Sequence, residues 1–277
     1  MSLQPDRTML ITQRQIEAWL AEDIGHHDVT NQVPGETTGR LVAKEQGIIS
    51  GMEAARDVFE YLGVECEPQV ENGDTIESGD TVLTVEGSAR EVLRSERCAV
   101  NVAAHASGIA TRTRAAVDAA REVSDSVRIA CTRKTTPGLR GLEKHAVVAG
   151  GGDTHRLDLS HMVMVKDNHI AEMGMEQAVE HFRERASFTT KIEVEVETPD
   201  DGKQAANAGA DIVLFDNMSP EDIERGVSML PGGVLSEASG GITRAEVPEY
   251  AATGVDVISM GSLTHSAPAL DYSFRTG

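Results

Sequence analysis

The sequence predicts an α/β protein with a small N-terminal domain followed by a larger domain of parallel strands. From residue 128 onward, short β-branched runs alternate with amphipathic helical segments, the pattern of parallel strands joined by crossover helices. The last four of these runs recur about every 21 residues, which leaves no room for an antiparallel layer. Residues 67–86, in contrast, have Asn-Gly and Ser-Gly-Asp turns between alternating stretches, as in small antiparallel strands.

The elements of the N-terminal part follow from spacing and turn residues. A long Ala-rich helical stretch is predicted over residues 89–122, with an interruption near Ser107-Gly108. We place a domain boundary there, so that residues 1–108 form the first domain. Before it, we predict a helix over 13–23, two strands over 40–50 around a turn at Gln46-Gly47, and a helix over 52–62.

The second part contains six predicted β/α units. Six units fit a parallel barrel with fewer units than the usual eight, or an open doubly wound sheet, and periodicity does not distinguish these. The strands are predicted over 128–132, 162–166, 192–196, 212–215, 234–238 and 256–260, and helices over 175–186, 200–208 and 220–229.

The charge of the chain excludes some classes of function. Its 45 acidic and 25 basic residues give a net charge of −20, which repels nucleic-acid backbones and anionic membranes. Only six of the bases are Lys, and we infer a halophilic origin, because high salt screens the repulsion of an acidic surface.

Cysteine content and hydropathy place the chain in a broad class. Cys66, Cys98 and Cys131 are widely spaced, with no C-x-x-C pair, which disfavours a disulfide scaffold or a structural zinc site. No apolar run has the length of a membrane span, and the N-terminus has no apolar targeting core. We therefore expect a soluble, cytoplasmic protein.

Polar side chains and glycines follow each predicted strand of the second part. In barrels and open α/β sheets alike, functional groups gather beyond the carboxyl ends of the strands. The groups at these ends are Thr132-Arg133-Lys134, Lys166-Asp167-Asn168-His169, Glu193 with Glu195, Asp216-Asn217, Ser239-Gly240-Gly241 and Gly261-Ser262-Leu263.

The distribution of charge indicates an anion site. Residues 128–169 hold seven bases and four acids, a charge of +3, whereas the rest of the chain, with 18 bases and 41 acids, is at −23. Arg133, Lys134 and Lys166 at strand ends are poorly explained by helix salt bridges. Glycines in the turn 239–241, before a helix predicted over 244–252, would expose N–H groups to a phosphate.

The predicted strand 192–196 carries clustered negative charge, in contrast to the positive charge of the anion site. Alternation places Glu193, Glu195 and Glu197 on one face, and burying like charges there requires cations. Lys134 and Lys166, or a bound Mg²⁺, would supply them. No G-x-G-x-x-G or G-x-x-x-x-G-K-[ST] motif is present, so dinucleotide and P-loop sites lack support.

Taken together, these motifs closely resemble those of the quinolinate phosphoribosyltransferase family, over essentially the whole chain. They are E-D-I-G-H-H-D-V-T at 22–30, S-E-R-C-A-V-N at 95–101, T-R-K-T-T-P-G-L-R at 132–140, G-G-G-x-x-H-R at 150–156, K-D-N-H-I at 166–170, E-V-E-V-E at 193–197, L-F-D-N at 214–217, E-A-S-G-G-I at 237–242 and G-S-L-T-H-S at 261–266.

The resemblance implies an N-terminal α/β sandwich and an open six-stranded α/β barrel of the type II phosphoribosyltransferase kind over residues 109–266, with the tail 267–277 returning to the first domain. It implies that quinolinate and phosphoribosyl pyrophosphate react, with Mg²⁺ and no organic cofactor, to give nicotinate mononucleotide, pyrophosphate and CO₂. It also implies a homodimer, with a hexamer as the larger alternative.

The resemblance assigns roles to residues already named. Arg133, Arg156 and Lys166, with Arg97 from the partner subunit, would hold the two carboxylates of quinolinate, and His155 would lie beside them. Lys134 would act at the pyrophosphate leaving group, while Glu195 and Asp216 would bind the ribose hydroxyls and the metal. The ribose phosphate and the rest of the substrate site would involve Thr132, Ser239, Gly240, Gly241, Gly261, Ser262 and Leu263.

Three alternatives stay open. The first is another enzyme or paralogue on the same scaffold, either one associated with molybdate transport or a nicotinate phosphoribosyltransferase that takes a monocarboxylate. A dicarboxylate substrate is favoured by five basic residues, which are Arg97, Arg133, His155, Arg156 and Lys166. An anion-binding protein without catalysis is disfavoured by Lys134, Glu195 and Asp216. A barrel aldolase in which Lys166 forms a Schiff base with the substrate is the least favoured alternative.

Overall fold

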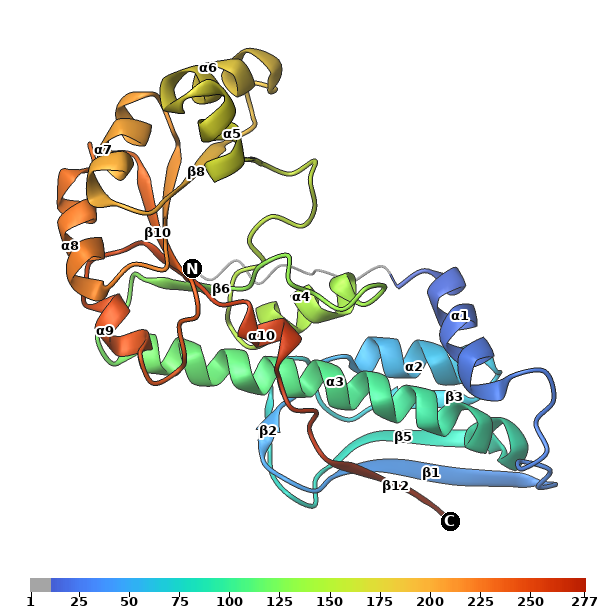
Figure 1. Cartoon of the computed structure of the whole chain (residues 1–277). Helices are drawn as coiled ribbons and strands as arrows, with labels where there is room; N and C mark the ends of the chain where they lie inside the picture. The colour runs from blue at the N-terminus through green and yellow to red at the C-terminus, as the bar shows by residue number, and fades with distance from the viewer. Residues whose placement is uncertain (1–10) are drawn as a thin grey trace. The chain divides into compact units, whose positions relative to one another are not determined.

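A computed structural model describes residues 11–277, so that residues 1–10 of the predicted first domain lie outside the described part (Figure 1). The chain divides into two compact units. Among the described residues, the first contains 11–112, 136–151 and 266–277, and the second contains 113–135 and 152–265. Helix α3 (Ala89–Arg121) belongs in part to each.

The first unit is built on a four-stranded antiparallel sheet in the order β12-β1-β5-β3. Its core is mostly aliphatic, and Leu41 and Leu83 of the sheet are almost fully buried together with the aromatic Phe59 of α2. The elements of this unit, besides α3, are α1 (Gln13–Ile24), β1 (Glu36–Ala43), β2 (Gly47–Ile48), α2 (Met52–Tyr61), β3 (Glu65–Pro68), β4 (Thr75–Ile76), β5 (Thr81–Ser88), α4 (Arg140–Ala149) and β12 (Tyr272–Thr276).

The predicted strand pair over residues 40–50 is wrong. Strand β1 pairs with β5 and β12, whereas β2 pairs with β4, so the two segments do not face each other across a turn. The Ile48 N–H donates instead to Thr111 Oγ1 of α3 at 2.8 Å. At Gly47 a Cβ would lie 2.8 Å from the same oxygen, so the glycine marks a close approach to a helix rather than a hairpin turn.

The predicted interruption of the long helix near Ser107-Gly108 is also wrong, because α3 continues through it. A Cβ at Gly108 would collide with the carbonyl group of Pro268. Ser107 Oγ donates to the Ser50 carbonyl at 3.0 Å and accepts from the Tyr272 hydroxyl at 3.0 Å. The small residues therefore admit the C-terminal segment beside the helix, which sequence periodicity does not reveal.

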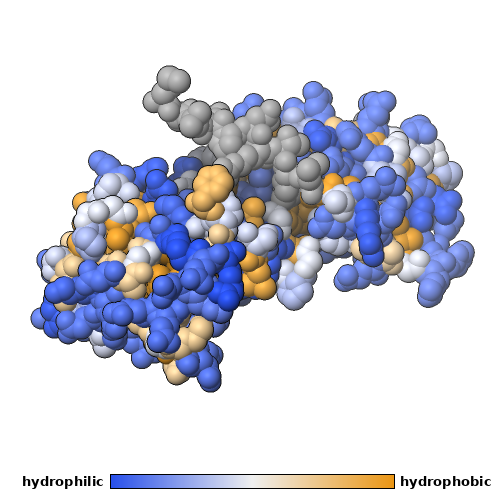
Figure 2. All heavy atoms as spheres, turned by 90° about the horizontal axis from the view of Figure 1, so that it is seen from above, coloured by the Kyte–Doolittle hydropathy of each residue, from blue (hydrophilic) through white to orange (hydrophobic). Residues whose placement is uncertain are grey.

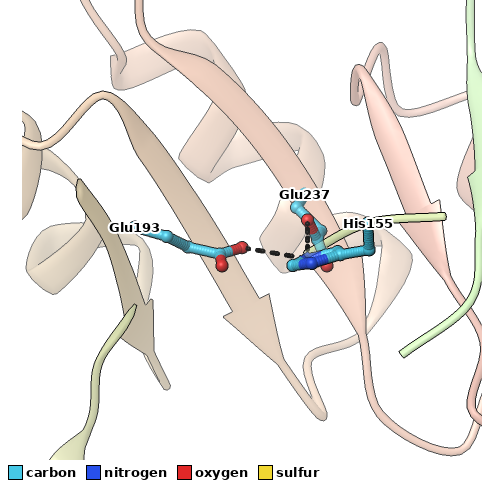
Figure 3. Close-up of side chains that lie close together, drawn as sticks. All are labelled: His155, Glu193 and Glu237. Atoms are coloured by element: carbon cyan, nitrogen blue, oxygen red, sulfur yellow. Dashed lines mark hydrogen bonds and ion pairs between the residues drawn. The ribbon is translucent and has the colours of Figure 1, made fainter. Parts of the chain in front are cut away.

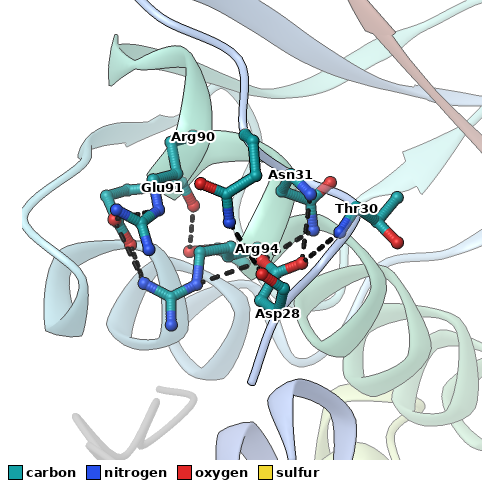
Figure 4. Close-up of polar contacts among 8 residues, drawn as sticks. Asp28, Thr30, Asn31, Arg90, Glu91 and Arg94 are labelled. Atoms are coloured by element: carbon teal, nitrogen blue, oxygen red, sulfur yellow. Dashed lines mark hydrogen bonds and ion pairs between the residues drawn. The ribbon is translucent and has the colours of Figure 1, made fainter.

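The loop before β1 is attached to α3 through Asp28 (Figure 4). The Asp28 carboxylate accepts the backbone N–H groups of Thr30 and Asn31 at 2.9 and 3.0 Å, and these bonds hold its pKa below the ordinary range. The Arg94 guanidinium lies 3.4 Å from the same carboxylate. The acidic motif at 22–30 thus has a structural use in the first unit.

The second unit contains a parallel sheet in the order β6-β11-β10-β9-β8-β7. Strands β7 to β11 follow chain order with β6 beside β11, which is the order of an open barrel and not of a doubly wound sheet. In Figure 1 helices α7 and α8 run side by side along the strands. The elements are β6 (Arg128–Ala130), β7 (Val163–Val165), α5 (Asp167–Met173), α6 (Met175–Arg185), β8 (Ile192–Val196), α7 (Pro199–Asn207), β9 (Ile212–Asp216), α8 (Pro220–Met229), β10 (Leu235–Ser239), α9 (Val247–Ala251), β11 (Val257–Ser259) and α10 (Ser262–His265).

Local sequence explains where the helices of this unit begin. Thr198 and Ser219 cap α7 and α8, and each is followed by a proline at the first helical position. The helix predicted over 244–252 is shorter than expected and begins at Val247, because the Glu246 carboxylate accepts from the N–H and hydroxyl of Thr243 in a preceding turn.

Hydrophilic residues cover most of the face seen in Figure 2. No helix within residues 11–277 has the length and apolarity needed to cross a membrane. Cys66, Cys98 and Cys131 form no disulfide with one another.

Candidate active site

A cavity of about 350 Å³ lies in the second unit and is lined by side chains from all six strands or the segments that follow them. Strand alternation puts residues two apart on the same face, so β8, β9 and β10 present Glu195, Asp216 and Ser239 at their carboxyl ends. The lining residues are Thr132, Arg133, Lys134, His155, Arg156, Met164, Lys166, Glu195, Leu214, Asp216, Glu237, Ser239 and Ser259.

Arg133 and Arg156 form a positively charged wall of this cavity. Burial lowers the pKa of Arg156, and the neighbouring charge of Arg133 lowers it further. The carboxylates of Glu193, Glu195 and Glu237 act in the opposite direction and offset this repulsion. Two guanidinium groups held close together form a site that favours an anion with more than one negative group.

Carboxylates from adjacent strands lie in the same cavity. Lys166 Nζ forms an ion pair with the Glu195 carboxylate. The Asp216 carboxylate accepts the side-chain amide of Asn217 at 2.6 Å. Asn217 has a left-handed backbone with φ 55°, and its N–H donates to the Ser239 carbonyl at 2.9 Å. The sheet therefore presents two fixed carboxylates beside two lysines.

Lys134 is held by its backbone. Its N–H donates to Thr132 Oγ1 at 3.0 Å, and its carbonyl accepts from Thr264 Oγ1 at 2.8 Å. The Lys134 side chain passes Gly261, where a Cβ would approach its Cδ to 2.8 Å. The residues after β11 therefore fix the direction of the Lys134 ammonium group.

His155 lies between two buried carboxylates (Figure 3). Its Nε2 is 3.1 Å from Glu237 Oε2 and 3.6 Å from Glu193 Oε1. Burial disfavours a charged ring, but the two neighbouring carboxylates outweigh it and raise the pKa of His155. Burial also raises the pKa of Glu193, whose side chain is 0% exposed.

The glycine turns lie just beyond the lining residues of β10 and β11. Gly240 has φ 104°, and a Cβ there would collide with Asn217, so this position requires glycine. Ser262 Oγ, at the start of α10, is buried and has no hydrogen-bond partner among residues 11–277. Of the residues predicted in these two turns, only Ser239 lines the cavity. Those that do not are Gly240, Gly241, Gly261, Ser262 and Leu263.

Arg97 is not among these residues. It lies on α3 in the first unit, where its side chain is 60% exposed and 3.5 Å from Glu96.

The structure adds residues that sequence reasoning did not single out. Met164, Leu214 and Glu237 line the cavity two residues before Lys166, Asp216 and Ser239, and Ser259 Oγ donates to Ser239 Oγ at 3.0 Å. The period of two along each strand is a signal that would have found them. Glu197 lies beyond the end of β8 and is exposed, so the predicted face of three glutamates reduces to Glu193 and Glu195.

The carboxylates fit a hard divalent cation. Mg²⁺ commonly uses one or two protein carboxylates together with substrate phosphates and water. Glu195 and Asp216 supply oxygen donors of this kind on adjacent strands. No thiol or cluster of imidazoles lines the cavity, so its donor set suits Mg²⁺ better than a softer metal.

Comparison with protein families matches two models that together span most of the chain. Residues 27–107 match the quinolinate phosphoribosyl transferase N-terminal domain, and residues 109–275 match the C-terminal domain of that family.

Individual proteins are similar over nearly their whole length. The probable nicotinate-nucleotide pyrophosphorylase (carboxylating) of Methanothermobacter thermautotrophicus is 46% identical, covering 94% of this chain and 97% of its own. The human nicotinate-nucleotide pyrophosphorylase (carboxylating) is 41% identical, covering 94% and 90%.

Solved structures show the same fold. The crystal structure of NadC from Streptococcus pyogenes superposes with a TM-score of 0.90 at 39% identity and covers 95% of both chains. Human nicotinic acid phosphoribosyltransferase superposes with a TM-score of 0.58 at 12% identity, covering 96% of this chain and 74% of its own, which is a likeness of fold alone.

Proposed function

The chain belongs to the quinolinate phosphoribosyltransferase family, and we propose that it converts quinolinate and phosphoribosyl pyrophosphate into nicotinate mononucleotide, pyrophosphate and CO₂. One observation carries the choice of a dicarboxylate substrate. A single cavity is lined by three cationic side chains, those of Arg133, Arg156 and Lys166. Three fixed positive charges suit a substrate with two carboxylates better than a substrate with one.

The same cavity supplies groups for transfer of the ribosyl group. Bond breaking at the ribose carbon develops positive charge on the sugar and negative charge on pyrophosphate. Carboxylates at Glu195 and Asp216 stabilise the former, and the Lys134 ammonium stabilises the latter. Mg²⁺ bound at Glu195 and Asp216 would supply further charge neutralisation at the pyrophosphate oxygens.

Loss of CO₂ follows from the chemistry of the substrate ring. Once the ring nitrogen is bonded to ribose it carries positive charge, and it stabilises the electron pair that CO₂ leaves on the adjacent carbon. That carbon then takes a proton. An organic cofactor is not required as an electron sink in this route.

The turns after β10 and β11 are proposed to hold the ribose phosphate. Ser239, Gly240 and Gly241 form one turn and Gly261, Ser262 and Leu263 the other. The buried Ser262 hydroxyl is a donor available to such an anion.

Assembly and environment extend the proposal. We propose a homodimer, with a hexamer as the larger alternative, in which Arg97 of each subunit enters the partner's cavity. The exposed position of Arg97 supports this. The domains are proposed to be 1–108 with the tail 267–277, and 109–266. The −20 charge supports a high-salt environment, and a cytoplasmic location is part of the same proposal.

A paired assay tests the function. The protein, in molar KCl with Mg²⁺ and phosphoribosyl pyrophosphate, is offered quinolinate or nicotinate, and formation of the mononucleotide is followed. Turnover of quinolinate alone is expected. Turnover of nicotinate alone would place the chain with the monocarboxylate enzymes, and no turnover of either would favour the transport-associated paralogue or a binding protein.

A further inference from the structure

His155, Glu193 and Glu237 form a cluster that the proposed reaction does not use directly. Their ligand atoms lie within 4.8 Å of one another. Glu193 and Glu237 are 0% and 3% exposed, and neither Glu193 oxygen has a hydrogen-bond partner within residues 11–277. In Figure 3 both carboxylates point toward the same ring nitrogen. Such buried charge requires a physical explanation.

A metal ion held by these three residues would be one explanation, but the other ring nitrogen opposes it. The backbone N–H of Arg156 points at His155 Nδ1 at 2.7 Å. An N–H group can only donate, so Nδ1 accepts from it and carries no proton. This contact opposes the second ring proton that the two carboxylates favour, and the ring proton that remains lies on Nε2. A histidine that binds a metal through Nε2 needs that nitrogen free of its proton. Here Nε2–H donates to Glu237 Oε2 and lies 3.6 Å from Glu193 Oε1.

The backbone around His155 is fixed from a second side. His155 has φ 50°, a left-handed conformation that is unfavourable for a residue with a side chain and persists where the surroundings determine it. Its N–H donates to Asp153 Oδ1 at 2.8 Å. Asp153 in turn exchanges backbone hydrogen bonds with Ile129 and Cys131 at 2.8 and 3.0 Å. This irregular segment is thus attached to β6 through Asp153 and to β8 and β10 through the His155 ring.

These contacts position Arg156. Its backbone N–H is held by His155 Nδ1, and its guanidinium lines the cavity beside Arg133. The charges of Glu193 and Glu237 also favour the charged form of Arg156 against the repulsion of Arg133. Arg156 lies outside any helix or strand, and its guanidinium also donates to Met164 Sδ at 3.1 Å.

We propose that Glu193 and Glu237 are positioning residues for the dicarboxylate site, which act through the His155 ring to hold Arg156 in place. The proposal rests on the proposed function for the identity of the anion. It assigns to His155 a structural link in place of a direct bond through Nε2 to the substrate.

Kinetics of Glu237→Ala test the link. We expect the KM for quinolinate to rise about tenfold or more, since a buried donor loses its acceptor, while the KM for phosphoribosyl pyrophosphate changes less than about threefold. Glu237→Gln keeps an oxygen that can accept from Nε2–H and should recover part of the loss. The control is Asp256→Ala, which removes a carboxylate bonded to Ser236 at the amino end of β10, away from the cavity. Equal rises in both KM values, as general destabilisation would give, would overturn the proposal.

A spectroscopic arm does not depend on turnover. The imidazole nitrogens of His155, assigned with His155→Asn, should show a proton on Nε2 and none on Nδ1, and Glu237→Ala should shift the Nε2 signal. Added Zn²⁺, which is diamagnetic, should leave the proton on Nε2 in place. A proton found on Nδ1 alone, or loss of the Nε2 proton on metal addition, would reject the positioning role. If the nitrogen signals match these expectations but quinolinate is not turned over, the proposed function is wrong, whereas the positioning role of Glu237 and His155 is retained.

Discussion

Gly261 leaves the space through which the Lys134 side chain passes. A Cβ on Gly261 would lie 2.8 Å from Lys134 Cδ and 3.3 Å from the His265 ring. The two residues are far apart in sequence, and the hydrogen bond from Thr264 to the Lys134 carbonyl holds the same pair of segments together.

Gly261→Ala should therefore displace Lys134 without unfolding the protein. A misplacement of the order of 1 Å can cost ~100-fold in rate, and we expect kcat to fall ten- to hundredfold. Steady-state kinetics beside a melting curve measure this. Gly232→Ala is the control, because a Cβ there meets nothing within 4 Å, and it should have full activity. Equal activity of the two variants would contradict the packing role of Gly261.

Lys134→Met tests the charge itself. Removing a preorganised charge at the leaving group is expected to lower kcat by ~10²–10³ with a smaller change in KM for quinolinate. The control is Lys203→Met on the exposed part of α7, which removes one positive charge without touching the cavity. A loss confined to KM would show that Lys134 contributes to binding and not to the transition state.

Glu143→Gln tests a buried pair in the first unit. Glu143 accepts from His105 at 2.9 Å and from the Thr136 N–H at 3.0 Å. Burial opposes its ionisation, but these hydrogen bonds outweigh burial and lower its pKa below 4.5. A lowered folded-state pKa stabilises the protein above the unfolded-state pKa, and this contribution is lost as the pH falls through the folded-state value.

At pH 7 the Glu143→Gln variant should therefore lose ~1–3 kcal/mol of unfolding free energy, and the difference from wild type should narrow as the pH falls below about 4.5. Denaturant unfolding at a series of pH values measures it. Glu180→Gln, at an exposed position of α6, should show little difference at any pH. A gap that widens toward low pH would reverse the sign assigned to Glu143.

Mixing inactive variants tests whether Arg97 acts across a dimer. Arg97→Ala and Lys134→Met should each be nearly inactive, but an exchanged equimolar mixture should regain about a quarter of wild-type activity, because half of the dimers then contain one intact site of two. Activity measured before and after subunit exchange gives the result. If the mixture stays inactive after exchange is verified, Arg97 acts within its own subunit.

Salt dependence tests the inferred halophilic origin. The net charge of −20 predicts that the melting temperature rises with KCl. Most of the gain should come below about 1 M, where the Debye length has already fallen to ~3 Å. Circular dichroism melts in a KCl series provide the measurement, and a flat response would reject the inference.

The charged residues at the strand ends could be predicted from the sequence. In a buried parallel strand, the change from apolar to polar residues marks the carboxyl end, where functional groups gather. Lys166, Glu195 and Asp216 were placed in this way, and the cavity contains all three. Glu237 was missed, although it shares a strand face with Ser239, because a charged residue within a strand gives no sign of what compensates it.

Long-range contacts account for the wrong expectations. The sequence predicts a turn at Gly47 and a helix break at Gly108, since glycine in a sequence signals backbone freedom. Their neighbours are Thr111 and Pro268, and only the folded chain shows that these glycines permit close packing.

The sequence by itself determined the class of fold, the family and the residue types that an anion site requires, because strand period, turn chemistry and charge are local properties. Tertiary structure decided the strand order of an open barrel, the path of Lys134 past Gly261 and the capture of His155 between Glu193 and Glu237. These depend on which segments meet in space, and contact between residues distant in the chain is set by packing of the whole unit.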